Sequence, residues 1–390
     1  MKNIGILEIH FHLKFLHTMM KICKTKDTKV TVFTTKPLLK RLETYLDDKK
    51  NYEFVLKEDG ETAYSFLKRV EKICDERIDL LFVNTIQIST LRIPFFLRFR
   101  PKSKMILTVH MLNHWLKAKF AFSKNIFRSI DVMFSIFLIR KILLPKYDAI
   151  NVIYPPMKDF VKNDTNYEKK VFSLPFNYYD KSKKTTSLKK DKKIRFVIPG
   201  LIETYRRNYD LALDVFERLF KKHNNKIILN IVGKPVGSGG KKIIERCENL
   251  KKKGYNITFS KGFVPEEEYN KISIESDIIF SPLNVKTKRD TGVEEIYGQT
   301  EGSALPFEAI QYCKPLIVPK EFNVIKEMKS STIQYISAKD LEKKIIELTE
   351  NKNKLAKLKN EAVKNSKNFS LEVLQIYFKK EILEKLDKLK

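Results

Sequence analysis

Residues Gly298–Pro319 read GQTEGSALPFEAIQYCKPLIVP. The order of small, apolar and turn-forming residues predicts a loop, a helix that opens at Gly302–Ala304, a turn at Lys314-Pro315 and a strand from Leu316. The backbone N–H groups and the positive dipole end of such a helix can bind phosphate. Glu308, one to two turns into the helix, can accept hydrogen bonds from sugar hydroxyls. The pattern therefore favours a nucleotide ligand, although a surface helix with an acid in its first turn would have the same sequence.

This stretch resembles the donor-site signature of retaining glycosyltransferases with the GT-B fold, the family four group (glycosyl transferases group 1). In that signature two carboxylates flank a glycine-rich turn and bind the sugar and the ribose of a nucleotide sugar. Glu308-Ala309 matches the second carboxylate, whereas the expected position of the first falls on Thr300, one residue before Glu301. The resemblance implies a ribose role for Glu308 and a sugar-orienting, catalytic role for Glu301. The donor-binding turn would comprise Thr300, Gly302 and Ser303.

Length and composition are those of a globular protein with more than one domain. The chain has 390 residues, 43% of them hydrophobic, which suffices for two or three domains with buried cores. Its four cysteines show no paired spacing, which argues against a disulfide framework or a zinc knuckle and fits a reducing cytoplasm. The N-terminal segment is typical of a buried strand and not of a signal peptide, and no apolar run is long enough to span a bilayer.

The formal net charge of +29 leaves three interpretations open. Nucleic-acid binding would require clustered basic residues with stacking aromatic side chains. A basic surface facing an anionic membrane would require amphipathic segments. A lysine-rich composition without a specific partner is the third interpretation, because lysine is spread along the whole chain.

Apolar runs alternate with helical periodicity in both halves of the chain, which predicts an α/β fold of two Rossmann-like domains facing a cleft. The resemblance implies that this fold has the GT-B architecture. We expect an acceptor-binding domain over 1–180, a linker over 181–193 and a nucleotide-sugar-binding domain over 194–369. We expect a terminal helix over 370–390 that crosses back to the first domain, or else stays on its own domain. The expected strands are Ile4–Ile9, Val30–Thr35, Tyr52–Leu56, Leu80–Asn84, Met105–His110, Ala149–Tyr154, Ile194–Pro199, Lys226–Val232, Ile257–Ser260, Asp277–Ser281 and Leu316–Val318.

The resemblance extends over about residues 194–370. In the family, a glycine after the first strand of this domain precedes an arginine and then a lysine, which hold the donor diphosphate. Here Gly200 is in place, Leu201 occupies the arginine position, and Arg206 or Arg207 falls at the lysine position. Arginine offers a bidentate fork for phosphate, so one or both could compensate. Two solvated arginines before a helix are the alternative.

The segment Phe259–Leu283 resembles the strand, glycine, helix and strand of the family that contact the nucleotide base. The resemblance implies that Gly262, Phe263 and Val264 lie near the base, although Phe263 could equally be a core residue. The polar segment 284–300 that follows could close over the donor.

Histidines lie at the carboxyl ends of two of the expected strands in the first half. His110 ends the strand Met105–His110, where relatives carry a histidine near the reacting sugar, and it is therefore a candidate catalytic residue. His10 and His12 alternate with Phe11 after the first strand, where the family has a glycine-rich loop, so the pair could face the cleft together. We expect no metal, since no carboxylate or cysteine lies at a convincing ligand spacing.

The segment 112–147 is rich in Phe, Ile and Leu with interleaved Lys and Arg. This composition suits a helix in a membrane interface, or a buried helix with snorkelling lysines. An interfacial position would indicate a lipid-linked acceptor.

The combined expectation is a cytoplasmic, metal-independent, retaining transferase that moves a hexose-type sugar from a nucleoside diphosphate sugar to an acceptor hydroxyl. We expect no cofactor besides the donor substrate, a glycan or lipid-linked acceptor, and a peripheral position at the inner face of the cell membrane. A basic nucleic-acid-binding protein, a non-catalytic GT-B scaffold subunit, and a sugar-nucleotide epimerase or hydrolase are the alternatives.

Overall fold

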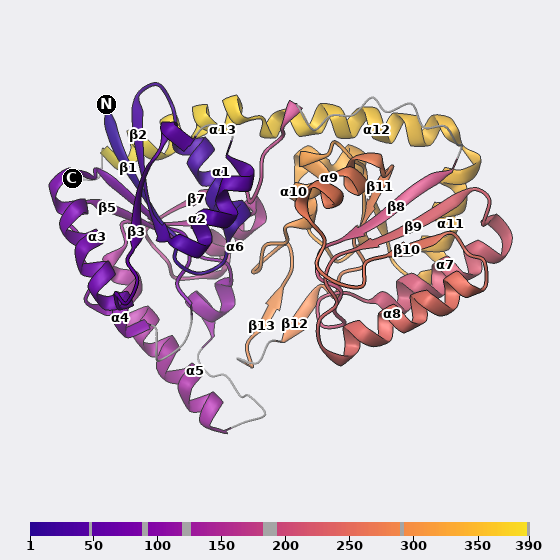
Figure 1. Ribbon diagram of the computed structural model, residues 1–390, viewed down its shortest axis with the longest axis horizontal. Coiled ribbons are helices and arrows are strands. Elements are labelled where there is room, and N and C mark those ends of the chain that lie inside the picture. Colours follow the sequence, from indigo (N-terminus) through magenta and orange to yellow (C-terminus); the bar gives the residue numbers. More distant parts are fainter. Residues whose placement is uncertain (47–48, 88–92, 119–125, 182–192, 289–291, 388–390) are drawn as a thin grey trace. The chain divides into compact units, whose positions relative to one another are not determined.

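A computed structural model describes residues 1–46, 49–87, 93–118, 126–181, 193–288 and 292–387 (Figure 1). The chain divides into two compact units. The first comprises Met1–Asn177, Lys288–Gly302 and Leu371–Lys390, and the second comprises Tyr178–Thr287 and Ser303–Ser370. Most of the expected linker over 181–193 lies outside the described residues.

The first unit contains a seven-stranded sheet with the order β3-β2-β1-β4-β5-β6-β7, in which neighbouring strands run parallel. Its strands are β1 (Lys2–Leu7), β2 (Thr28–Thr35), β3 (Glu53–Lys57), β4 (Leu80–Val83), β5 (Lys104–Thr108), β6 (Ala149–Val152) and β7 (Lys170–Ser173). Every residue of β4 and β6 is buried, as expected of parallel strands covered on both faces.

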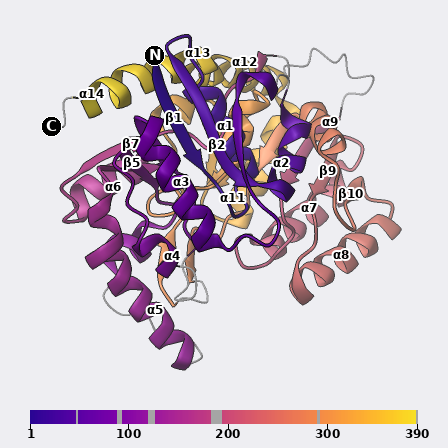
Figure 2. The same ribbon diagram turned by 60° about the vertical axis from the view of Figure 1, so that its left-hand side comes forward.

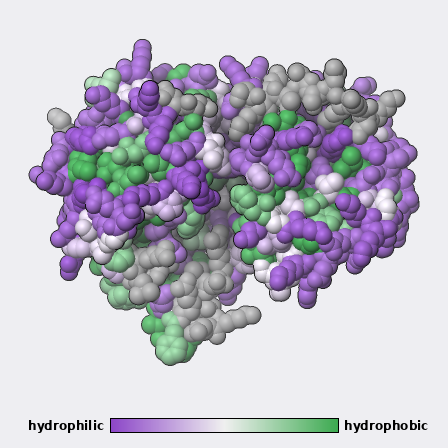
Figure 3. Space-filling view, viewed as in Figure 1, coloured by the Kyte–Doolittle hydropathy of each residue, from purple (hydrophilic) through white to green (hydrophobic). Residues whose placement is uncertain are grey.

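Helices follow most of these strands, which is the connection that parallel neighbours require. They are α1 (Leu13–Cys23), α2 (Lys36–Leu42), α3 (Ala63–Arg77), α4 (Ile93–Leu97), α5 (Ile126–Leu138) and α6 (Pro155–Asp164). Thr62 is the N-cap residue of α3, and its hydroxyl oxygen accepts a hydrogen bond from the backbone N–H of Ser65 at 3.0 Å. In Figures 1 and 2, α5 extends away from the sheet of its unit, and Figure 3 shows hydrophobic side chains at its free end.

The second unit contains a six-stranded parallel sheet with the order β10-β9-β8-β11-β14-β15. Its strands are β8 (Ile194–Pro199), β9 (Ile227–Val232), β10 (Ile257–Phe259), β11 (Ile278–Phe280), β14 (Leu316–Pro319) and β15 (Thr332–Tyr335). Its helices are α7 (Tyr209–His223), α8 (Gly237–Lys252), α9 (Glu266–Glu275), α10 (Leu305–Gln311), α11 (Ala338–Glu350) and α12 (Lys352–Ser366).

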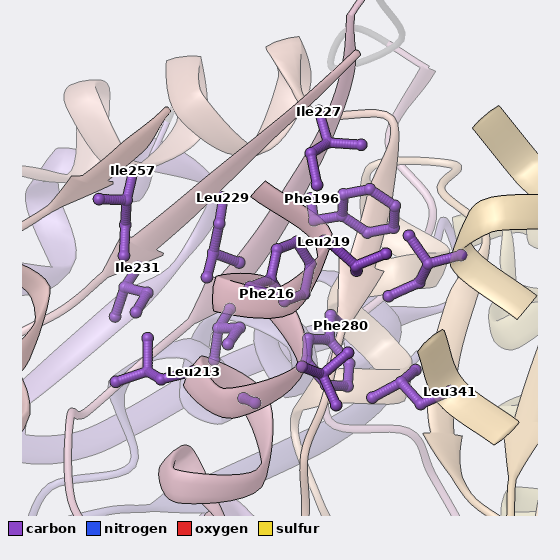
Figure 4. Close-up of a cluster of buried hydrophobic side chains, with 14 of the residues drawn as sticks. Phe196, Leu213, Phe216, Leu219, Ile227, Leu229, Ile231, Ile257, Phe280 and Leu341 are labelled. Atoms are coloured by element: carbon purple, nitrogen blue, oxygen red, sulfur yellow. The ribbon is translucent and has the colours of Figure 1, made fainter. Parts of the chain in front are cut away.

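The core of the second unit forms where α7 packs on this sheet (Figure 4). Phe216 of α7 lies edge-on to Phe196 of β8, with 5.3 Å between the ring centroids, and 6.0 Å from Phe280 of β11. Leu219 and Leu341 are buried in the same cluster. Each such aromatic pair adds about 1 kcal/mol to the stabilisation from burial.

The segment Lys288–Gly302 belongs to the first unit, although elements of the second unit flank it in sequence. It contains β13 (Glu294–Ile296), which pairs with β12 (Lys286–Lys288) in a two-stranded sheet.

The terminal helical segment also belongs to the first unit. It comprises α13 (Leu371–Tyr377), a π-helical turn at Phe378–Leu383 and α14 (Glu384–Asp387). The side-chain amide of Gln375 donates to the carbonyl oxygens of Lys21 and Lys24, at 3.0 and 2.6 Å, at the end of α1. The ring of Phe378 packs against Phe82 of β4.

No helix within the described ranges is both long and apolar enough to pass through a bilayer. The expected strands are all present, with ends that differ by at most two residues. The strands β7 and β15 were not expected, and both are edge strands of their sheets. Their residues are mostly half-buried, so they lack the continuous apolar run of a central strand.

Candidate functional site

The strand order of the first unit reverses between β1 and β4, and ligands of open α/β sheets bind at the carboxyl ends of the strands at such a point. Glu8 follows β1 there, and Thr85 follows β4. The Thr85 hydroxyl donates to Oε2 of Glu8 at 2.6 Å, and the backbone N–H of His10 donates to Oε1 at 2.8 Å. Burial raises the pKa of Glu8 to about 7, against the opposing effect of these hydrogen bonds. Glu8 was not predicted as a site residue, although an acid directly after a buried first strand was a signal for it.

His110 follows β5 at the same edge of the sheet. Its Nε2 lies 3.1 Å from the carbonyl oxygen of Asn84, so this nitrogen carries the proton of the bond, because a carbonyl only accepts. The ring of His12 stacks on His110 with 4.3 Å between centroids. His10 instead lines a separate pocket. His10 and His12, which the sequence pattern predicted to face the same cleft, therefore have different neighbours.

That pocket has a volume of about 510 Å³, within the range of small-molecule sites. It opens at the carboxyl ends of β1, β2 and β3, and it combines apolar walls with cationic and acidic side chains. Lys36 forms an ion pair with Asp59 in its wall. Its lining residues include Ile9, His10, Thr35, Lys36, Lys57, Glu58, Asp59 and Phe96.

Met111 and Glu301 pair in an isolated antiparallel bridge within the first unit. The backbone N–H of Leu112 donates to the carbonyl oxygen of Thr300 at 2.8 Å. His110 directly precedes Met111, so the backbone segments that carry the two predicted catalytic residues, His110 and Glu301, lie side by side. The Glu301 side chain is buried.

Glu295 holds this neighbourhood together from β13. Its carboxylate accepts the backbone N–H groups of Asn113 and His114, at 3.2 and 2.9 Å. These residues begin the π-helical turn Asn113–Lys117, so the acid caps its free N–H groups. Burial raises the pKa of Glu295 to about 7. Glu295 was not predicted as a site residue, because its partners lie about 180 residues earlier in the chain.

Two predicted donor-binding residues, Thr300 and Gly302, have internal roles in the first unit. The Thr300 hydroxyl accepts the backbone N–H of Ile296 at 2.8 Å, which closes the turn between β13 and Glu301. A Cβ atom at Gly302 would lie 2.4 Å from Cγ1 of Ile153, so only glycine fits there without displacement. Their roles toward a donor stay predictions.

The strand order of the second unit reverses between β8 and β11, and the predicted phosphate-binding loop lies at this point. Gly200 follows β8 with a φ of +98°, a conformation that favours glycine. Arg207 pairs with Leu283, which follows β11. The Arg207 guanidinium donates to the carbonyl oxygen of Pro199 at 2.6 Å and also to that of Leu201. Arg207 therefore stabilises the loop itself.

The Arg206 side chain has a different environment from that of Arg207. It forms an ion pair with Glu203 within the same loop and is 37% exposed. Leu201, at the family's arginine position, is exposed. Both arginines are half-buried, but Arg207 donates to backbone carbonyls of the loop, whereas Arg206 pairs with an acidic side chain.

Glu308 lies on α10 and is buried. The phenol of Tyr269, on α9, donates to Oε2 of Glu308 at 2.5 Å. Burial and the neighbouring Glu308 carboxylate hold the pKa of Tyr269 well above its usual value, so the phenol stays a donor. The helix α10 has only seven residues, and the Ser303 hydroxyl accepts the backbone N–H of Leu305 at 3.3 Å near its start. The predicted helix therefore begins one to three residues later than expected.

The predicted base-contacting segment, Gly262 to Val264, follows β10 at the edge of the second sheet. Phe263 is 80% exposed, so the alternative that it is a core residue of its unit is wrong. Nothing lies within 4 Å of a Cβ atom placed on Gly262. Within the described ranges, no group of three or more His, Cys, Asp or Glu side chains could hold a metal ion.

No protein-family model matches the sequence, and a search of curated proteins finds no match. Solved structures are similar over the whole chain. Anabaena HepE, in complex with UDP and glucose, is 13% identical with a TM-score of 0.66, and the match covers 100% of both chains.

Two other solved structures match the chain at similar coverage. TarM from S. aureus, in a complex that contains UDP, is 10% identical with a TM-score of 0.66 over 97% of this chain and 99% of that one. The N-terminal domain of trehalose-6-phosphate phosphatase from Candida albicans is 12% identical with a TM-score of 0.61, over 98% and 96%. The chain has the GT-B fold, as the resemblance in the sequence predicted.

Proposed function

We propose that the protein is a glycosyltransferase that moves a sugar from a nucleoside diphosphate sugar to an acceptor hydroxyl. The observation that carries this proposal is the buried Glu308 carboxylate on α10 of a GT-B fold, at the position that matches the ribose-binding carboxylate of the resembling family. The bond from Tyr269 fixes the orientation of this carboxylate. The UDP and glucose bound by HepE and the UDP bound by TarM support a UDP-sugar as the donor.

The second unit would bind the donor. Glu308 accepts the ribose hydroxyls, Arg206 and the backbone N–H groups near Ser303 hold the diphosphate, and Gly262 to Val264 contact the base. The reaction breaks the bond between the anomeric carbon and the diphosphate oxygen, so stabilising the charge that develops on the leaving group lowers the barrier most. Arg206 is the side chain best suited to this, because it is a partly exposed cation.

The first unit would bind the acceptor and the sugar. The pocket of about 510 Å³ that His10 lines has the size and the mixed lining of an acceptor site. Glu301 and His110 would orient the transferred sugar. Retention of the anomeric configuration, independence of metal, and a role in surface glycan or lipid-linked polysaccharide synthesis in the cytoplasm are further parts of the proposal that rest on the resemblance.

The test is the thermal stability of the purified chain with a panel of UDP-, GDP-, ADP- and dTDP-sugars. A ligand that binds only the folded state raises the melting temperature by mass action. We expect a rise with one nucleotide sugar that Glu308→Gln abolishes. Glu350→Gln, which changes an exposed acid of α11, is the matched control and should keep the rise. No rise with any donor, together with retention on nucleic acid at physiological salt, would overturn the proposal in favour of a nucleic-acid-binding protein.

One observation favours a second candidate function, a non-catalytic GT-B scaffold subunit. Leu201 replaces the family's arginine, and Arg207 donates to backbone carbonyls of its own loop. A chain that binds a nucleotide sugar but neither hydrolyses it nor transfers the sugar to any glycan or lipid acceptor would support this candidate.

A further inference from the structure

The outer face of helix α5 is apolar and exposed. Its exposed side chains recur at the spacing of one helical face, and their exposed fractions run from 36% to 80%. They are Ile126, Phe127, Ile130, Met133, Phe134 and Phe137. We call this set the α5 face. No charged residue belongs to it among the α5 residues whose side chains the structure describes.

The opposite side of α5 packs on its own unit. Val132 and Ile136 form a buried cluster with Val293, and Ser135 is buried beside them. The helix is thus held in the fold by one side while its other side stays exposed. An ordinary surface helix would present charged and polar residues on the outer side.

A continuous apolar surface of this kind marks an interaction site in proteins. With 13 residues at about 1.5 Å each, α5 is about 20 Å long, short of the roughly 30 Å hydrocarbon core of a bilayer. It can lie in the plane of an interface but cannot span it. Phenylalanine and isoleucine side chains are those that interfacial helices insert beneath the headgroups.

The charge of the sequence segment that contains α5 indicates which surface the α5 face meets. The segment 112–147 contains a single acid, Asp131. Its basic residues are Lys117, Lys119, Lys124, Arg128, Arg140, Lys141 and Lys146. Lys141, three residues beyond α5, is exposed. A second copy of the chain would bring the same basic segment against this one, so self-association through this face is opposed by repulsion between like charges.

We propose that the α5 face docks the protein on a membrane surface rich in anionic lipids, with its apolar side chains in the headgroup region and basic side chains of the same segment, Lys141 among them, on the lipid charges. The two contributions are complementary, since basic residues near an anionic bilayer and inserted apolar side chains each strengthen the association. This surface goes beyond the proposed transferase activity and does not depend on it.

The test is flotation of the full chain with vesicles of neutral phosphatidylcholine, or of phosphatidylcholine with a third phosphatidylglycerol. We expect association with the anionic vesicles that falls as salt is raised. The triple variant Phe127→Ser, Phe134→Ser, Phe137→Ser should lower the partition coefficient at least about tenfold. Lys141→Gln should lower it about fivefold on anionic vesicles only.

Matched controls are Ile336→Ser and Ile376→Ser, which remove exposed apolar side chains elsewhere and should bind vesicles as the unmodified chain does. All substituted side chains of the triple variant are exposed, and thermal unfolding will verify that it folds. Absence of association with anionic vesicles, or equal association of the triple variant, would overturn the proposal. So would a dimer in gel filtration that the triple variant converts to a monomer, since the α5 face would then meet a second copy.

Discussion

The backbone of Met111 pairs with that of Glu301, 190 residues further along the chain. This bridge places the loop that follows β5 against the turn that follows β13. Of the two predicted catalytic residues, His110 directly precedes this bridge and Glu301 forms part of it. Glu295 reinforces the contact by accepting two backbone N–H groups of the first loop. The consequences of these contacts can be measured separately.

Glu295→Ala should destabilise the first unit by about 2 kcal/mol, because the N–H groups of Asn113 and His114 lose their buried acceptor. Glu294→Ala, which removes the exposed acid beside it, should change stability by less than about 0.5 kcal/mol. Urea unfolding measures both. Equal effects of the two substitutions would show that the Glu295 carboxylate does not hold the loop.

The pKa of Glu8, raised to about 7 from an ordinary value of 4.5, predicts a pH dependence of stability. Between these values the folded state binds more protons than the unfolded state, so this contribution is greatest below pH 4.5 and is lost as the pH rises to about 7. The unmodified chain should therefore gain up to about 3 kcal/mol relative to Glu8→Gln as the pH falls through this window. Urea unfolding at a series of pH values checks it.

Thr85→Val provides a second readout of the same group. The Thr85 hydroxyl lowers the pKa of Glu8, so its removal should move the upper end of the pH window upward. A stability difference between the unmodified chain and Glu8→Gln that does not vary with pH would contradict the assignment of the window to Glu8.

Gly302→Ala should destabilise the chain by about 2 kcal/mol, because the added Cβ atom would meet Ile153. Ile153→Ala alone should also be destabilising, since it leaves a cavity. The double variant should be about 1 kcal/mol more stable than the sum of the two single effects predicts, because the smaller side chain at position 153 leaves room for the Cβ atom at position 302. Gly262→Ala is the control, with nothing within 4 Å of the new atom. Strict additivity in the double-mutant cycle would rule out the contact.

Arg207→Ala should mainly affect stability, and Arg206→Ala should mainly affect nucleotide-sugar binding. Arg207→Ala removes two hydrogen bonds to the carbonyls of the Gly200 loop and should lower the free energy of unfolding by about 2 kcal/mol. Arg206→Ala breaks a partly exposed ion pair and should change it by less than about 1 kcal/mol. If Arg206 holds the diphosphate, its removal should weaken nucleotide-sugar binding at least about tenfold by calorimetry. The reverse pattern would exchange the two roles.

The central strands were predictable because they carry continuous apolar runs. The strand β8 was expected over Ile194–Pro199, and it has these bounds. The edge strands β7 and β15 were not predictable in this way, since most of their residues are half-buried and they carry no continuous apolar run, whereas the edge strands β3 and β10 were expected. The start of α10 was also misplaced, because the small residues before it are compatible with a turn or with a first helical turn.

The same division holds for the site. Local order along the chain was enough to predict two α/β halves and to place Gly200 and His110 at the carboxyl ends of strands, because hydrophobic periodicity and the alternation of elements are properties of neighbouring residues. The GT-B fold was implied by the resemblance of the donor-site motif. Only the tertiary structure decided that Glu295 caps the loop of His114, that Ile153 requires glycine at position 302, and that Arg207 serves its own loop. These contacts join segments by packing and hydrogen bonds in three dimensions, which leave no periodic trace in the sequence.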